Sequence, residues 1–286
     1  MDSLIDWFME PLAYPFMQNA LIVGIIVGTV CATLSCYLVL KGWSLMGDAI
    51  SHAVLPGVVI AHLLAIPLAI GAFVSGIFCT LAIGYLKENS RIKEDTVMGI
   101  VFSGMFAIGL VMFVKVDTNQ HLLHILFGNI LGITHDEFVQ SLIISFVVLT
   151  YIVLKRKDLL LYCFDPTHAR TIGLNIKLLH YGLLVLLALV IMSAMQVVGT
   201  ILVVAMLITP GITGYIVVKR FDRMLMIAIG TAIFSAIFGV LFSFHFNVAT
   251  GPCIVLLQAV CFLISFAITY VKRHCLQRNI AEKVTS

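Results

Sequence analysis

Long stretches without a charged residue constrain this chain more than any other feature of its sequence. Residues 49–86 contain no Lys, Arg, Asp or Glu, and the same is true of residues 178–218. A helix that crosses a bilayer needs roughly 20 apolar residues, so each stretch is long enough for two crossings. The 286 residues are 61% hydrophobic and 11% charged, with a mean hydropathy of +1.12, which leaves little sequence for a soluble domain. We therefore predict an all-α polytopic membrane protein.

The apolar stretches predict about nine membrane-spanning helices. The two long stretches are expected to turn near Ile66-Pro67 and around residues 195–199. Single crossings are expected at 19–40, 96–114, 138–154, 224–244 and 246–271. Eight crossings remain an alternative if one long stretch holds a re-entrant or broken helix. Pro210, followed by Gly211, is a candidate helix break in the seventh span, because proline lacks the N–H that a helix interior needs.

The basic residues predict how the chain is oriented in the membrane. With the N-terminus outside and nine crossings, only Lys115 of the seventeen Lys and Arg residues lies outside, and the C-terminus is cytoplasmic. This distribution is typical of a membrane protein whose cytoplasmic loops are positively charged. We expect a transmembrane domain over residues 1–272 and a cytoplasmic tail over 273–286.

Asp48 and His52 are the polar residues that most need a function. Asp48 is the one acidic residue of the fourteen that apolar sequence encloses, and His52 follows four residues later. On a helix this spacing places both side chains on one face. A carboxylate and an imidazole without a thiolate suit Mn²⁺ or Fe²⁺, and Zn²⁺ also accepts them. Two ligands bind a cation only weakly, which suits a transporter that must release it.

Plainer interpretations of these two residues remain open from the sequence. Lys41 places the preceding turn near the cytoplasmic edge, so Asp48 could cap the second span. His52 could be a core imidazole that bonds a backbone carbonyl. Two copies of the pair across a two-fold axis would instead offer two carboxylates and two imidazoles to one cation.

Two segments outside the expected spans carry further polar residues. Residues 119–132 contain His121 and His124 and are too short to cross, so an ordered loop helix and a surface segment that catches metal are both open. On the cytoplasmic side, Asp165 can cap a short helix, Pro166 suits its first position and Gly173 suits its end. Ala169 and Ile172 are expected on one side of this short helix.

The sequence lacks the motifs of several functional classes. It contains no GxxxxGK[ST] phosphate loop, no HExxH motif, and seven cysteines without metal-ligand spacing. We therefore expect no catalytic residues and no permanently bound cofactor. Transport by this chain would take its energy from another chain, with the short helix after Asp165 as the contact.

Several segments resemble the membrane permeases of manganese, zinc and iron ATP-binding-cassette importers, and among them the Sit- and Yfe-type manganese/iron permeases. The resemblance covers residues from about 12 to 270 and is most specific in the stretch from Gly47 to Gly57. The matching segments are 41–57, 89–100, 124–128 and 199–210.

The resemblance implies a fold similar to the vitamin-B12-type importers, with two permease subunits, two cytoplasmic ATPases and a periplasmic metal-binding protein. The second permease is either an identical copy or a paralogue. Asp48 and His52 match the family's positions for the metal in transit. Asp165, Ala169 and Gly173 match the family's cytoplasmic coupling segment, here residues 164–174, which docks on the ATPase.

The sequence therefore predicts a multi-pass permease subunit in the bacterial inner membrane that moves Mn²⁺ and/or Fe²⁺ by alternating access. Its expected partners are those subunits and membrane lipid, with no nucleic acid. A zinc-specific permease of the same family and a carrier driven by an ion gradient are the alternatives. An intramembrane enzyme would lack a recognisable motif, and a structural anchor would leave Asp48 and His52 unexplained.

Overall fold

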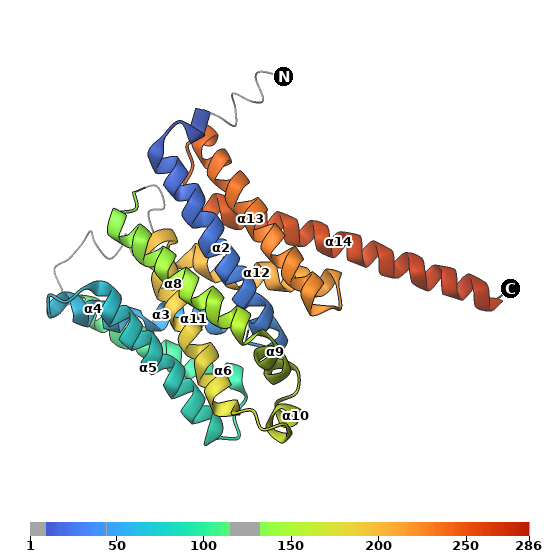
Figure 1. The fold of residues 1–286 in the computed structure, drawn as a ribbon, viewed down its shortest axis with the longest axis horizontal. Helices are drawn as coiled ribbons and strands as arrows, with labels where there is room; N and C mark the ends of the chain where they lie inside the picture. The colour runs from blue at the N-terminus through green and yellow to red at the C-terminus, as the bar shows by residue number, and fades with distance from the viewer. Residues whose placement is uncertain (1–9, 44, 115–131, 286) are drawn as a thin grey trace.

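The computed structural model describes residues 10–43, 45–114 and 132–285, apart from the side chains of Glu94 and residues 273–285, and the regular structure in these ranges is helical (Figure 1). The first half contains α2 (Pro15–Lys41), α3 (Met46–Ala53), α4 (Leu55–Leu63), α5 (Leu68–Glu88) and α6 (Glu94–Val114). Next come α8 (His135–Leu154), α9 (Arg156–Phe164), α10 (Pro166–Thr171) and α11 (Ile176–Val198). The chain continues with α12 (Thr200–Val217), α13 (Phe221–Phe246) and α14 (Thr250–Thr285).

Nine helices in these described ranges are long and apolar enough to cross a membrane, which confirms the predicted count. The short helices α3 and α4 together form one of them, and the apolar part of α14 ends at Lys272. The expected turns are also present, since Ile66-Pro67 separates α4 from α5 and Gly199 alone separates α11 from α12. His121, His124 and Lys115 lie outside the described residues, and the orientation of the termini stays a prediction.

The helices form two groups that α11 connects. Helices α2, α12, α13 and α14 pack on one another in the first group, and α3, α4, α5 and α6 do so in the second. Helix α11 contacts α2 and α12 on one side and α3 and α5 on the other, and α8 packs on both α11 and α2. Figure 1 shows α14 extending away from the other helices toward the C-terminus.

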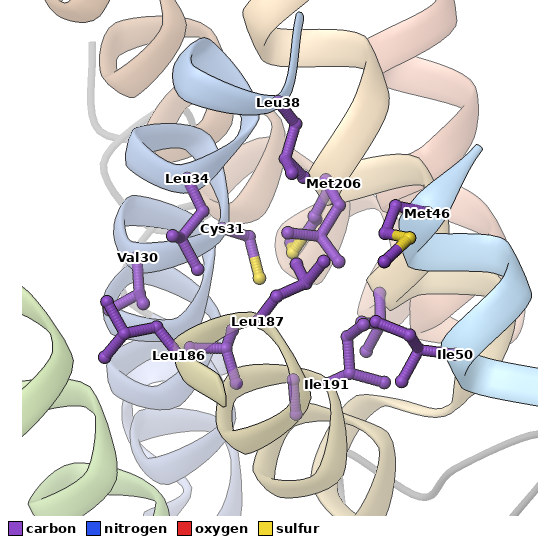
Figure 2. Close-up of a cluster of buried hydrophobic side chains, with 14 of the residues drawn as sticks. Val30, Cys31, Leu34, Leu38, Met46, Ile50, Leu186, Leu187, Ile191 and Met206 are labelled. Atoms are coloured by element: carbon purple, nitrogen blue, oxygen red, sulfur yellow. The ribbon is translucent and has the colours of Figure 1, made fainter. Parts of the chain in front are cut away.

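The core lies where α2, α3, α11 and α12 meet. Figure 2 shows side chains of all four helices in one buried cluster, and Met46 and Ile50 are the residues labelled from α3. The others labelled there are Val30, Cys31, Leu34, Leu38, Leu186, Leu187, Ile191 and Met206, none more than 6% exposed. One face of α3 is thereby fixed against the first group of helices.

The span that contains α3 is interrupted at Val54. Pro56 has no N–H to donate to the carbonyl of His52 four residues earlier, so the helix cannot continue regularly through this point. The hydroxyl of Ser75 on α5 donates to the carbonyl of Ala53 at 2.7 Å. This bond supplies a partner at the interruption, where lipid could offer none.

Two glycines bring α4 and α5 into backbone contact immediately after this interruption. A Cβ atom built on Gly57 would lie 2.1 Å from the carbonyl oxygen of Gly71, and one on Gly71 would lie 2.2 Å from that of Gly57. No side chain fits at either position without separating the helices. This close packing is typical of small residues at the interfaces of membrane helices.

The helix break predicted at Pro210 is wrong, because α12 continues through this residue from Thr200 to Val217. The hydroxyl of Ser35 on α2 accepts a hydrogen bond from the Gly211 N–H at 3.0 Å and lies 3.3 Å from the Ile208 carbonyl oxygen. A neighbouring helix therefore satisfies backbone groups beside the proline, and the helix need not separate.

We predict that Ser35→Ala destabilises the packing of α2 on α12. The substitution leaves the Gly211 N–H and the Ile208 carbonyl without this hydroxyl in a buried contact, at a cost of about 1–3 kcal/mol. The thermal unfolding temperature of the purified protein in detergent should therefore fall. Thr33→Val is the matched control, because the Thr33 hydroxyl bonds only within its own helix, to the carbonyl of Thr29. Equal unfolding temperatures for Ser35→Ala and wild type would contradict the prediction.

Candidate functional site

Helix α3 has two faces with different surroundings. Met46, Ile50 and Ala53 are at most 1% exposed and belong to the core. Asp48 and His52 lie on another face, and their side chains are 38% and 36% exposed. The core contacts therefore hold one side of this short helix in place while the two polar side chains remain accessible.

Asp48 and His52 lie in direct contact. The Asp48 Oδ1 and His52 Nε2 atoms are 3.3 Å apart, as expected for side chains one helical turn apart. Pro56 ends the regular helix just beyond His52, so the pair occupies the last two turns before the interruption at Val54. This arrangement presents a carboxylate oxygen and an imidazole nitrogen toward the same space.

Two phenylalanines of α6 form one wall beside His52. The ring of Phe106 lies edge-on to the imidazole with centroids 5.3 Å apart, and that of Phe102 lies 6.2 Å away. Phe102 and Phe106 are themselves four residues apart and face α3 from one side of α6. They restrict the orientation of the imidazole without adding a competing hydrogen bond, and nothing in the sequence distinguishes them from ordinary apolar residues of a span.

The plainer interpretations of the two residues do not describe this geometry. Asp48 lies in the first turn of α3, but the N-cap residue is Leu45 and no side chain caps the helix. The imidazole of His52 is paired with Asp48. The predicted proximity of the pair on one helix face is therefore what the structure contains.

The site offers a divalent cation two ligands from this chain. No group of three or more His, Cys, Asp and Glu side chains that could hold a metal occurs among the residues that the structure describes. Oxygen and nitrogen donors without thiolate suit Mn²⁺, Fe²⁺ and Zn²⁺. Because such ions take at least four ligands, the remaining ones must come from water or from another chain.

The predicted short helix after Asp165 is present as α10. Asp165 Oδ1 accepts hydrogen bonds from the N–H groups of Thr167 and His168, at 3.0 and 2.9 Å. Pro166 occupies the first turn, and Gly173 has a φ of +85° just beyond the helix. The bond from the His168 N–H is the main reason that the pKa of the Asp165 carboxyl is lowered. The sequence predicted the cap, the proline and the terminal glycine correctly.

The two apolar residues expected on one side of this helix have different surroundings. Ala169 is the fully buried residue of α10, whereas Ile172 lies beyond the last residue of the helix and is 56% exposed. Helix α10 packs on α9 and on α11. Ala169 therefore anchors α10 to the protein, and Ile172, together with the 63% exposed Phe164, remains available to another surface.

A partly buried polar cluster near α9 was not predicted. The Tyr162 hydroxyl and the His180 Nδ1 atom are 2.8 Å apart, and the indole of Trp43 packs edge-on against the His180 imidazole with centroids 5.2 Å apart. The Lys41 Nζ atom lies 4.1 Å from the centroid of the Tyr162 ring. These residues are far apart in the sequence, and no local pattern indicates that they meet.

The fold and the site together define a helical membrane protein with a small ionic site on a short helix next to a break in its span. A match to the ABC 3 transport family covers residues 13–269. The chain therefore belongs to this family, and the resemblance proposed from the sequence is confirmed.

Several relatives are similar over most of their length. The chain is 65% identical to a probable iron transport system membrane protein of Haemophilus influenzae, covering 94% of this chain and 99% of the relative. It is 61% identical to the chelated iron transport system membrane protein YfeD of Yersinia pestis, covering 95% and 92%. It is also 53% identical to the manganese transport system membrane protein MntB of Synechocystis, covering 91% and 85%.

A solved structure has the same fold. A chain of PsaBC from Streptococcus pneumoniae, determined in complex with Fab, superposes with a TM-score of 0.82 at 41% identity. The similarity covers 92% of this chain and 95% of that chain. The arrangement of helices described above is therefore shared with this chain of known structure.

We predict that Asp165→Ala loosens the first turn of α10, because two backbone N–H groups lose their acceptor. Hydrogen exchange of a peptide that covers residues 164–174, followed by mass spectrometry, should become several-fold faster. Asp165→Asn should exchange like the wild type, since asparagine caps helices about as well as aspartate. Because the folded pKa is lowered, the cap is fully present above the unfolded pKa of about 3.9 and is lost as the pH falls through the folded value. Unchanged exchange in Asp165→Ala would disprove this role.

Proposed function

We propose that this chain is the membrane-spanning subunit of an ATP-binding-cassette importer that moves Mn²⁺ and/or Fe²⁺ across the bacterial inner membrane. Asp48 and His52 would bind the ion during its passage. The observation that carries the proposal is the 3.3 Å contact of these two side chains on an accessible face of α3. Membership of the ABC 3 transport family and the iron and manganese relatives support it.

The partial exposure of the site supports a second permease subunit opposite α3. An imidazole and a carboxylate facing lipid would be costly, whereas facing another polar surface they gain partners. A second copy or a paralogue that presents the same pair would bring the ligands to four. The ion would then lie between two subunits, where alternating movements could expose it first to one side of the membrane and then to the other.

The ion's identity follows only in part from the ligands. Carboxylate and imidazole suit Mn²⁺ and Fe²⁺, but the same donors bind Zn²⁺ more tightly under the Irving–Williams order. Preference for manganese or iron must therefore depend on geometry and on the protein that delivers the ion. A zinc-specific permease with the same ligands is the alternative within the family.

The energy would come from separate ATPase subunits docked on the coupling segment, residues 164–174. Helix α10 within it is capped and anchored by buried Ala169, while Ile172 and Phe164 expose apolar surface beside it. We further propose a transmembrane domain over residues 1–272, a cytoplasmic tail over 273–286 and a periplasmic metal-binding protein as the third partner.

We predict that Asp48→Ala and His52→Ala each abolish ATP-dependent uptake of radioactive Mn²⁺ into proteoliposomes that contain the complete importer. Each variant removes one of the two ligands that this chain supplies, while the core face of α3 is unchanged. The yield of assembled complex should equal that of the wild type. Asp136→Ala and His62→Ala are the controls, since they remove an exposed aspartate and a half-buried histidine elsewhere in the spans.

Three results would contradict the proposal in different ways. Wild-type uptake in both Asp48→Ala and His52→Ala would remove these residues from the pathway. Uptake by the purified chain without ATPase subunits would favour a carrier driven by an ion gradient. Uptake of Zn²⁺ but of neither Mn²⁺ nor Fe²⁺ would favour the zinc-specific alternative.

We predict that Ile172→Asp weakens binding of the ATPase subunits. The substitution places a charge on the exposed apolar surface beside α10, and the affinity should fall by roughly tenfold or more if this surface is desolvated in the complex. Co-purification of the ATPase subunits with the tagged permease measures the effect. Ile92→Asp is the control, because Ile92 is also exposed and lies in the loop before α6. Equal recovery of the ATPase subunits with both variants would exclude Ile172 from the interface.

A further inference from the structure

A cluster of two buried and two half-buried side chains connects the elements that carry the two proposed functional segments. The cluster consists of Lys41 at the end of α2, Trp43 before α3, Tyr162 on α9 and His180 on α11, and we call it the Trp43 cluster. Trp43 and Tyr162 are only 1% and 2% exposed. Its members come from four different parts of the chain, so their contacts fix how those parts lie relative to one another.

On one side, the Trp43 cluster leads directly to Asp48. The backbone N–H of Trp43 donates to the Leu38 carbonyl at 2.8 Å, and the backbone carbonyl of Trp43 accepts from the Met46 N–H at 3.1 Å. The backbone of Trp43 therefore joins the end of α2 to the first turn of α3. A displacement that carries the Trp43 backbone with the tightly packed indole therefore moves the start of the helix that carries Asp48 and His52.

On the other side, the Trp43 cluster leads to α10. Tyr162 lies on α9 three residues before Asp165, and the fully buried Ala169 holds α10 against α9 and α11. Because α9 and α10 are joined at Asp165 and packed together, a displacement of α10 also displaces Tyr162 on α9. The 2.8 Å contact between the Tyr162 hydroxyl and His180 couples this displacement to the imidazole against which Trp43 packs.

One buried polar atom distinguishes the Trp43 cluster from an ordinary apolar core. The Trp43 Nε1 atom is buried and makes no hydrogen bond with the described residues. Buried indole N–H groups usually find an acceptor, and one without a partner is unfavourable. A rearrangement that gave this N–H an acceptor would remove an unfavourable contribution to the free energy. This favours a second arrangement of the Trp43 cluster.

We propose that Tyr162, His180 and Trp43 are positioning residues for transport, which carry a displacement of α10 to α3 and so set the position of Asp48 and His52. This inference rests on the proposed function. The three side chains do not contact the ion. They act through the backbone that connects Trp43 to α3.

The test uses Tyr162→Phe in the complete importer reconstituted in proteoliposomes. This variant removes only the hydroxyl that contacts His180, and the quantity measured is the amount of Mn²⁺ transported per ATP hydrolysed. We expect this ratio to fall by about fivefold, the factor that corresponds to the loss of one hydrogen bond between neutral groups. Tyr181→Phe is the matched control, since Tyr181 is the next residue after His180 and only its ring contacts the imidazole.

A second measurement follows Trp43 itself. The importer is labelled with 5-fluorotryptophan, and the ¹⁹F resonance of Trp43 is identified by its loss in Trp43→Phe. We expect ATP to shift this resonance in the wild type and in Tyr181→Phe, and the shift to be lost in Tyr162→Phe. His180→Asn should retain the shift because its side chain can still bond the Tyr162 hydroxyl, whereas His180→Leu should lose it.

The outcomes separate this inference from a merely structural role and from the proposed function. If uptake and ATP hydrolysis fall together in Tyr162→Phe, with the ratio unchanged, the cluster is structural and the inference is overturned. An ATP-dependent Trp43 shift that persists in Tyr162→Phe also overturns it. If the wild-type importer transports no metal, the proposed function fails, and the ¹⁹F shift still shows whether ATP moves Trp43 through Tyr162.

Discussion

Every backbone polar group inside a bilayer needs a partner within the protein, and this requirement determines where the helices of this chain can be irregular. The span containing α3 and α4 is interrupted at Val54, where the hydroxyl of Ser75 supplies a partner for the Ala53 carbonyl. Beside Pro210, the hydroxyl of Ser35 serves two backbone groups, and the helix continues. In both places a short hydroxyl side chain on a neighbouring helix supplies a partner for backbone groups beside the proline.

The interruption at Val54 also lets a short helix carry a carboxylate and an imidazole in contact inside an apolar protein. Met46 and Ile50 fix α3 in the core, while Asp48 and His52 remain on an accessible face and contact each other. The proposed metal pathway needs both properties, because the ligands must be held in place yet must reach an ion and a second subunit.

Features that depend on local sequence could be predicted, and features that depend on distant contacts could not. Uncharged stretches indicated nine spans, the four-residue spacing placed Asp48 beside His52, and Asp165, Pro166 and Gly173 indicated α10. The helix break predicted at Pro210 is absent, because the hydroxyl that bonds the backbone beside the proline belongs to Ser35, which is far away in the sequence. The contact between Tyr162 and His180 likewise forms only after α9 and α11 have packed together.

The glycine contact between α4 and α5 has a mechanical consequence. Gly57 and Gly71 bring the two backbones so close that neither helix can slide or rotate without a collision, so the pair behaves as a rigid unit. The movement of α3 proposed above would therefore change the chain direction at the interruption around Val54, between the turn that carries Asp48 and His52 and the rigid hairpin. A single methyl group at Gly57 would separate α4 from α5, and the hairpin would no longer be rigid on the far side of this interruption.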